Sequence, residues 1–267
     1  MEYRELGRTG EKVSVIGMGC WGLGLSRDKR EWIREIATLQ RGIELGMNLI
    51  DTAERYSSGR SEELVGEAVK DCRDDVFIAT KVAPPNLHYD AVIRACKDSI
   101  KRLGVSYIDL YQIHWPDPGV PIEDTMSAME KLVQDGLVRY IGVSNFSASE
   151  TDAARAALAK NEIASNQVEY ALTNRSVEGD ILPYCVGEKI TLIAYSPLAH
   201  GHITRSITGD ILQKYDMTPA QAMLNWVTRN EQVVAIPKAG NIRHQEENAS
   251  SIGVRFSAAD YERISSG

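Results

Sequence analysis

Eight short apolar segments alternate with longer amphipathic segments along this chain of 267 residues, and this alternation constrains the fold more than any other feature. The apolar segments span residues 15–19, 47–51, 76–81, 107–114, 140–144, 163–169, 191–195 and 233–236. Strands that alternate with helices form a parallel sheet with both faces covered, and eight of them favour a closed barrel over an open sheet. We therefore predict an α/β chain folded as a (β/α)₈ TIM barrel, with residues 1–267 in a single domain.

The connecting segments have the spacing of helices. In the first of them, apolar residues recur four, three and four positions apart before Gly46 ends the pattern, namely Trp32, Ile36, Leu39 and Ile43. Ser61 is placed to cap the next helix, whose first turn is acidic. Residues 3–14 suggest an N-terminal hairpin, and residues 243–251 and 258–265 suggest extra helices at the C-terminal end.

Composition narrows the possible partners and location. The formal charge of −7 argues against a nucleic-acid partner, and no apolar run is long enough to cross a bilayer. The start of the sequence lacks the apolar core of a signal peptide. Cys20, Cys72, Cys96 and Cys185 are scattered, and the five histidines show no ligand spacing. We expect reduced thiols, no metal site and a cytoplasmic protein that does not bind membranes.

Residues 17–22 match G-x-G-x-x-G, the glycine pattern of dinucleotide-binding loops. Such a loop needs the glycines to open a helix directly after a strand, but the helical pattern starts only near Asp28. Trp21 would also crowd a pyrophosphate turn. Glycines that shape the mouth of a barrel explain this segment better.

Polar residues with complementary chemistry follow three successive predicted strands. Asp51, Lys81 and His114 stand at strand ends, and Tyr56 lies in the loop after Asp51. In barrels of this kind, catalytic groups come from the carboxyl ends of the strands and the loops that follow. We expect these four side chains to meet at one mouth.

Together these residues suit the reduction of a carbonyl group. A tyrosine with a pKa of about 10 is a weak acid, and a nearby ammonium such as Lys81 favours the phenolate and strengthens it. Asp51 would hold Lys81 in place and keep it charged. His114 could hydrogen-bond the substrate oxygen.

Two motifs carry a resemblance to a known family. Residues 51–62, DTAERYSSGRSE, closely resemble the D-T-A-x-x-Y-x-x-G-x-S-E signature of aldo-keto reductases, and residues 80–82 and 111–116 resemble its lysine and histidine segments. The resemblance implies a catalytic tetrad of Asp51, Tyr56, Lys81 and His114. It extends over nearly the whole chain.

The same resemblance implies a nicotinamide cofactor. The residues that match the contacts to the nicotinamide carboxamide are Ser144, Asn145 and Gln167, and Tyr195 matches the aromatic residue that stacks on the nicotinamide ring. Lys238 matches the contact to the 2′-phosphate, and Glu247 and Asn248 match the contacts to adenine. The remaining expected cofactor contacts are Gly19, Cys20, Trp21, Ser196, Pro197, Leu198, Gly201, Ile236, Ala239, Gly240, Asn241 and His244.

Three positions depart from the family pattern. Ser57 replaces a frequent Gly after the tyrosine, Ala239 replaces a frequent Ser after Lys238, and His244 stands where many members have Arg. The phosphate site is therefore weaker than usual. Lys238 still favours NADPH over NADH, because a cation there pairs with a phosphate dianion.

The sequence predicts reversible, NADPH-dependent reduction of an aldehyde or ketone, with Tyr56 as proton donor. Trp21, Tyr56, His114 and Trp115 are expected to line the substrate pocket. Arg55 either attracts an acidic substrate or faces solvent. Two alternatives stay open: a cofactor-binding regulatory subunit with slow turnover, and an aldolase that forms a Schiff base on Lys81. The family implies a monomer by default, and the sequence does not fix the oligomeric state.

Overall fold

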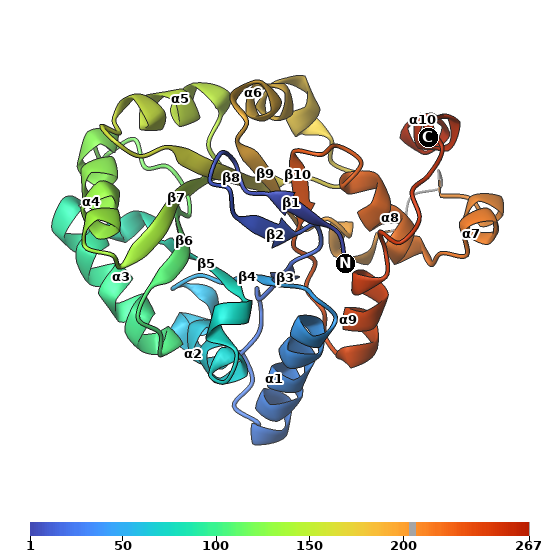
Figure 1. The fold of residues 1–267 in the computed structure, drawn as a ribbon, viewed down its shortest axis with the longest axis horizontal. Coiled ribbons are helices and arrows are strands. Elements are labelled where there is room, and N and C mark those ends of the chain that lie inside the picture. The colour runs from blue at the N-terminus through green and yellow to red at the C-terminus, as the bar shows by residue number, and fades with distance from the viewer. Residues whose placement is uncertain (203–206, 267) are drawn as a thin grey trace.

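The computed structural model describes residues 1–202 and 207–266, and its core is one sheet of eight parallel strands. The strands pair in chain order: β3 (Met18–Gly19), β4 (Leu49–Asp51), β5 (Phe77–Val82), β6 (Ile108–Ile113), β7 (Val138–Ser144), β8 (Ile163–Glu169), β9 (Thr191–Tyr195) and β10 (Val233–Ala235). Each lies within or within two residues of an apolar segment of the sequence, and together they curl into a ring (Figure 1).

Backbone hydrogen bonds between the segment just before β3 and the last strand, β10, close the ring. Gly17 N donates to Ala235 O at 2.8 Å, and Ala235 N donates to Val15 O at 2.9 Å. The backbones approach closely at Gly19, where an added Cβ would lie 2.4 Å from Ile236 O. The predicted (β/α)₈ barrel is confirmed, and a glycine is needed where its two edges meet.

Helices surround the barrel on its outside (Figure 1). They are α1 (Lys29–Glu44), α2 (Arg60–Val69), α3 (Tyr89–Leu103), α4 (Ile122–Gln134), α5 (Ala148–Ala156), α6 (Ile181–Glu188), α7 (Gly209–Tyr215), α8 (Pro219–Val227), α9 (Ile242–Ala249) and α10 (Ala258–Ser265). The sequence did not predict α7. Within the described ranges, no helix combines the length and apolar character that a membrane crossing requires.

Ser61 does not cap α2 as the sequence suggested. The helix starts at Arg60, after Gly59 in a left-handed conformation with φ +89°. The Ser61 hydroxyl is buried and donates to Cys20 O at 3.1 Å. It also lies 2.9 Å from the hydroxyl of Thr52. Ser61 therefore ties the loop after β3 to the loop after β4, at the mouth that carries the site.

The predicted N-terminal hairpin is present as β1 (Tyr3–Glu5) and β2 (Lys12–Ser14), which pair antiparallel. It lies across one end of the ring of strands (Figure 1). Leu6 and Val13 are fully buried against residues that point into the barrel from the beginnings of the strands, such as Leu49 and Phe77. The hairpin therefore closes the N-terminal end of the barrel and leaves the C-terminal mouth open.

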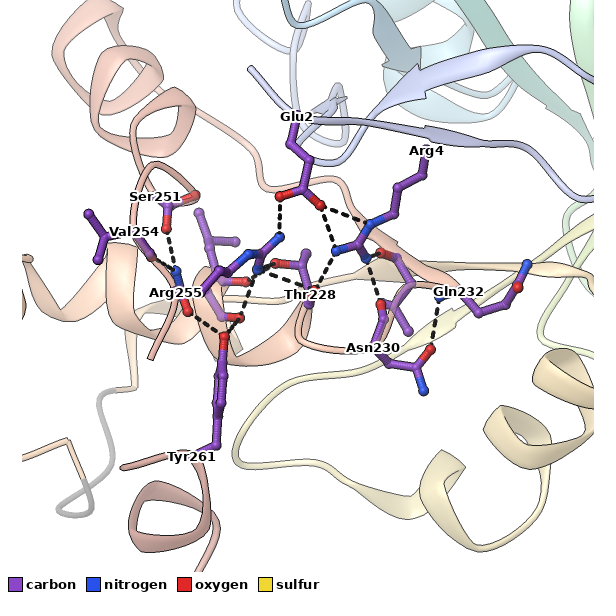
Figure 2. A network of polar contacts seen from close by, with 12 residues as sticks. Glu2, Arg4, Thr228, Asn230, Gln232, Ser251, Val254, Arg255 and Tyr261 are labelled. Carbon is purple, nitrogen blue, oxygen red and sulfur yellow. Dashed lines mark hydrogen bonds and ion pairs between the residues drawn. The ribbon is translucent and has the colours of Figure 1, made fainter. Parts of the chain in front are cut away.

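A polar network joins the start of the chain to its C-terminal segment (Figure 2). Glu2 accepts a hydrogen bond from Arg4 at 2.9 Å through one carboxylate oxygen and from Arg255 at 2.8 Å through the other. Both arginines also donate to Thr228, at the end of α8. The network holds the extra C-terminal segment against the barrel.

Candidate active site

The four residues predicted to be catalytic lie together at the C-terminal mouth. Asp51 is the last residue of β4, Lys81 lies near the end of β5, and His114 directly follows β6. Tyr56 begins a short helical turn, Tyr56–Gly59, in the loop after β4. Because neighbouring parallel strands end at the same edge, residues that are 30 or more positions apart in the chain become neighbours in space.

Lys81 joins two of these groups. Its Nζ donates to Asp51 Oδ1 at 2.5 Å, to Thr52 O at 2.8 Å and to Tyr56 Oη at 3.3 Å. Lys81 is fully buried. Burial alone would lower the pKa of Lys81, but Asp51 and the Tyr56 hydroxyl outweigh it and raise the pKa above its usual value. Lys81 therefore carries its charge next to the tyrosine oxygen.

Two amides hold the other oxygen of Asp51. Gln167 Nε2 donates to Asp51 Oδ2 at 2.7 Å, and Gln112 Nε2 donates to the same oxygen at 3.3 Å. Gln112 pairs in register with Lys81 on the adjacent strand and is fully buried. Sequence reasoning missed Gln112. The available signal was a polar residue near the end of a buried strand, two positions before His114.

Tyr56 and His114 face one another across the mouth. Their ring centroids lie 5.6 Å apart with planes at 77°. Burial, followed by the charges of Lys81 and Arg55, lowers the pKa of His114 to about 3. The imidazole is therefore neutral at physiological pH, and its buried Nδ1 has no partner among the described residues.

The pKa of Tyr56 does not follow the expectation from the sequence. Burial raises the pKa of Tyr56, and the charge of Lys81 offsets only part of that increase. The effect of Lys81 has the expected sign, but burial is larger. Tyr56 remains a protonated phenol, and hence a hydrogen-bond donor, through the neutral range.

A cavity of about 740 Å³ opens over these groups. Sixteen of the predicted site residues line it: Gly19, Trp21, Asp51, Tyr56, His114, Trp115, Ser144, Asn145, Gln167, Tyr195, Ser196, Pro197, Leu198, Gly201, Ile236 and Lys238. Lys81 lies beneath the cavity wall. The lining also contains four residues that were not assigned to the site, namely Arg55, Glu169, Pro237 and His200.

One wall of the cavity is a chain of hydrogen-bonded side chains. Tyr195 Oη donates to Asn145 Oδ1 at 3.0 Å, and Asn145 Nδ2 donates to Ser144 Oγ at 3.0 Å. Ser144 Oγ in turn donates to Gln167 O at 2.9 Å. Asn145 has a left-handed backbone with φ +62°, which an asparagine tolerates better than most residues. The arrangement presents amide and hydroxyl groups from three strands to a ligand.

The remaining predicted cofactor residues do not line the cavity. Cys20 is buried behind it, and its backbone N donates to Asp51 O at 2.9 Å. The others lie at the start of α9 or along it: Ala239, Gly240, Asn241, His244, Glu247 and Asn248. Asn241 caps the helix by accepting from His244 N at 3.0 Å, and the buried Asn248 Nδ2 has no partner in the part of the chain that the structure describes.

The glycines of residues 17–22 do not form a dinucleotide-binding loop. α1 begins at Lys29, where Asp28 accepts from Arg30 N at 2.8 Å as the cap. Gly17 and Gly19 instead pack against Leu49 and Ile236. Trp21 reaches over the mouth, and its ring lies 6.5 Å from that of His200 between centroids. Gly19 and Trp21 line the mouth of the barrel, as the sequence suggested, whereas Gly17 packs against Leu49 at the beginning of β4.

Comparisons with known proteins agree with this geometry. The model of the Aldo/keto reductase family matches residues 15–266. Methylglyoxal reductase YeaE of Escherichia coli K12 is 39% identical over 254 residues, covering 93% of this chain and 88% of that protein. The thermostable aldo-keto reductase Tm1743, solved with the inhibitor epalrestat, superposes with a TM-score of 0.95 at 39% identity over 100% of this chain and 99% of that one.

An aldo/keto reductase from Klebsiella pneumoniae, solved with NADP and acetate, superposes with a TM-score of 0.91 at 35% identity, covering 98% of this chain and 93% of that one. The family match spans the strands that carry Asp51, Lys81 and His114 and continues through α9 and α10. The chain belongs to the aldo/keto reductase family.

Proposed function

We propose that this protein reduces an aldehyde or ketone to the alcohol with NADPH, and that Tyr56 donates the proton. The observation that carries the proposal is the position of Lys81 Nζ, 2.5 Å from Asp51 Oδ1 and 3.3 Å from Tyr56 Oη, beneath a cavity that Tyr56 lines. A charged, buried ammonium at that position serves little purpose other than to stabilise negative charge on the tyrosine oxygen.

Each group of the tetrad then has a defined task. When bound, NADPH supplies the hydride that the carbonyl carbon accepts. Tyr56 gives its hydroxyl proton to the carbonyl oxygen, and Lys81 stabilises the phenolate that remains. Asp51 holds Lys81. His114, neutral because of the lowered pKa, donates a hydrogen bond from a ring nitrogen to the same oxygen and orients the carbonyl. The same groups serve the reverse oxidation.

Several features of the cavity fit a nicotinamide dinucleotide. Ser144, Asn145 and Tyr195 present hydrogen-bonding groups and an aromatic ring beside the tetrad. Beyond them, Asn248 offers an unpartnered buried amide that would suit a purine edge. The Klebsiella relative was solved with NADP. These residues would hold the cofactor along the wall formed by β7, β8, β9 and the start of α9.

Lys238 supports NADPH over NADH. It is exposed on the cavity wall and makes no hydrogen bond or ion pair with another described residue. A cation that is free at this position would bind the 2′-phosphate. His244 lies one turn into α9 and can add a donor there.

The aldolase alternative fits the geometry poorly. A Schiff base needs an uncharged amine that a substrate can reach. Lys81 is fully buried, lies outside the cavity lining and has a raised pKa because of Asp51. The regulatory-subunit alternative does not explain why the tetrad is complete and aimed into an open cavity.

The test follows NADPH absorbance with a panel of aldehydes and ketones that includes methylglyoxal, the substrate in the name of the Escherichia coli relative. We expect turnover with NADPH to exceed that with NADH. Lys238→Ala should reduce this preference by about tenfold, since it removes one ionic contact to the phosphate. Absence of turnover on every carbonyl, with tight NADPH binding intact, would overturn the proposal in favour of a regulatory subunit.

A further inference from the structure

The substrate end of the cavity contains one charged side chain that the tetrad does not use. Arg55 directly precedes Tyr56 in the loop after β4 and lines the cavity together with Trp21, His114 and Trp115. The other charged residues of the cavity lining either form an ion pair or lie on other strands. Asp51 is paired with Lys81, Glu169 is the last residue of β8, and Lys238 lies three residues after the end of β10.

The guanidinium of Arg55 has no partner among the described residues, and the residue is exposed. Its neighbour Glu54 forms no ion pair with it; Glu54 Oε1 instead accepts from Ala83 N at 2.6 Å and from Asn86 Nδ2 at 2.9 Å. Arg60, five positions further along, shows the contrast: it donates to Ser26 O at 3.1 Å and does not line the cavity. Arg55 is therefore a free cation at the edge of the site.

Arg55 is also close enough to act on a molecule held at the tetrad. After burial and Lys81, its charge is the next cause of the lowered pKa of His114. The charge of Arg55 therefore acts on the imidazole of His114, the group proposed to contact the carbonyl oxygen. Two exposed indole rings lie in the same lining, because Trp21 and Trp115 are 65% and 49% exposed. A ligand with an apolar body and an anionic end matches this surface.

We propose that Arg55 is a specificity-determining residue and that the preferred substrates are carbonyl compounds that carry a carboxylate. This inference rests on the proposed function, since it assigns the substrate class of that reaction. The planar guanidinium offers paired donors to a carboxylate while Tyr56 and His114 hold the carbonyl oxygen. Arg55 touches the substrate away from the reacting atoms, so its effect is on binding.

The test compares 4-carboxybenzaldehyde with its neutral analogue 4-formylbenzamide. In the wild type, kcat/KM is expected to favour the acid. Arg55→Gln should lower the ratio of acid to amide by about tenfold, through the KM of the acid, with little change for the amide. Arg55→Lys should retain part of the preference. The matched control Arg60→Gln removes a nearby charge outside the cavity and should leave the ratio unchanged.

Salt provides a second readout. The preference for the acid should fall in 0.5 M NaCl in the wild type, because an exposed charge pair is screened, and should not fall further in Arg55→Gln. An unchanged ratio in Arg55→Gln would overturn the proposal. An equal loss of the preference for the acid in Arg60→Gln would also overturn the proposal. Such a result would indicate that the overall positive charge of this loop, rather than a contact with Arg55, sets the preference.

Failure of the proposed reductase function would give a different result from failure of the Arg55 proposal. If the wild type turns over neither aldehyde nor any other carbonyl of the panel, the reductase proposal fails, and the Arg55 site is tested by binding alone. Trp21 and Trp115 line the cavity, so quenching of tryptophan fluorescence by 4-carboxybenzaldehyde measures its Kd. A Kd about tenfold weaker in Arg55→Gln supports the anion site. Equal Kd values in the two proteins contradict it.

Discussion

Lys81 and Asp51 form an ion pair that is buried at the centre of the barrel mouth, with Nζ 2.5 Å from Oδ1 and both residues essentially inaccessible to solvent. The desolvation of two such charges can exceed their mutual attraction, so the pair contributes little evidence for stability. The third contact of Lys81, to Tyr56, explains its presence better. The ion pair therefore places a positive charge beside Tyr56, the residue proposed as proton donor, at an energetic cost to the fold.

Removing one partner of this pair should destabilise the protein. Lys81→Met leaves the Asp51 carboxylate buried without its counterion, which costs about 3 kcal/mol in comparable sites. The double variant with Asp51→Asn removes the charge and keeps an acceptor for Gln167, so it should be less destabilised than the sum of its single changes. Urea unfolding measures the free energy of unfolding of the single and double variants. A Lys81→Met protein as stable as the wild type would show that the pair is not buried as described.

His114 should remain neutral far below the usual range. Burial, Lys81 and Arg55 lower its pKa to about 3. In NMR spectra of labelled histidine, the signal that is lost in His114→Gln should keep its neutral shifts from pH 8 down to pH 5. A midpoint near pH 6.5, the usual value for histidine, would contradict this assignment.

The same shift makes stability depend on pH in one direction. Unfolding exposes His114, which then binds a proton below about pH 6.5, while the folded imidazole stays neutral until about pH 3. The stabilising contribution of neutral His114 to the free energy of unfolding is therefore fully present above pH 6.5 and is lost as the pH falls towards 3. His114→Gln should lose less unfolding free energy than the wild type over this interval. Equal slopes in the two proteins would argue against it.

Gln112 should act as a positioning residue for Asp51. Gln112→Leu removes the donor at 3.3 Å from Oδ2 and should lower kcat by a few fold with KM little changed. Gln112→Glu places a second carboxylate beside Asp51. Because one of the two must then bind a proton, the loss of activity should be larger at pH 8 than at pH 6. A pH profile for Gln112→Glu with the same shape as that of the wild type would exclude this role.

Gly19 is required where the barrel closes. In Gly19→Ala the new Cβ would lie 2.4 Å from Ile236 O, so β3 and β10 must separate, at a cost of about 1–3 kcal/mol. Gly179→Ala is the control, since nothing lies within 4 Å of the Cβ it would introduce. Thermal unfolding should show a lower Tm for the first variant only. A similar Tm for both variants would indicate that the backbone where β3 meets the end of β10 can move to accept a side chain at little cost.

Features that depend on local pattern could be predicted from the sequence. The strands, the N-terminal hairpin and the meeting of Asp51, Lys81 and His114 follow from periodicity and from the rule that parallel strands end at one edge. α7 was missed because it is seven residues long and has only Ile211 buried, which leaves no periodic face.

The features that the sequence did not predict correctly depend on contacts between segments that are distant in the chain. The side chain of Ser61 could cap its own helix or bond to Cys20 O, and only the folded loop decides between them. The position of Gln112 beside Asp51 depends on the register of β5 against β6. The pKa of Tyr56 depends on the balance between burial and the Lys81 charge, and that balance exists only once the cavity has formed.

The most direct test of the account is a single-turnover measurement with NADPH bound in advance to the wild type and to Tyr56→Phe. The account predicts similar NADPH affinity in the two proteins and hydride transfer to an aldehyde slower by about 10² or more in the variant, the range expected for loss of a general acid. Hydride transfer in Tyr56→Phe at close to the wild-type rate would contradict the assignment of Tyr56 as the proton donor.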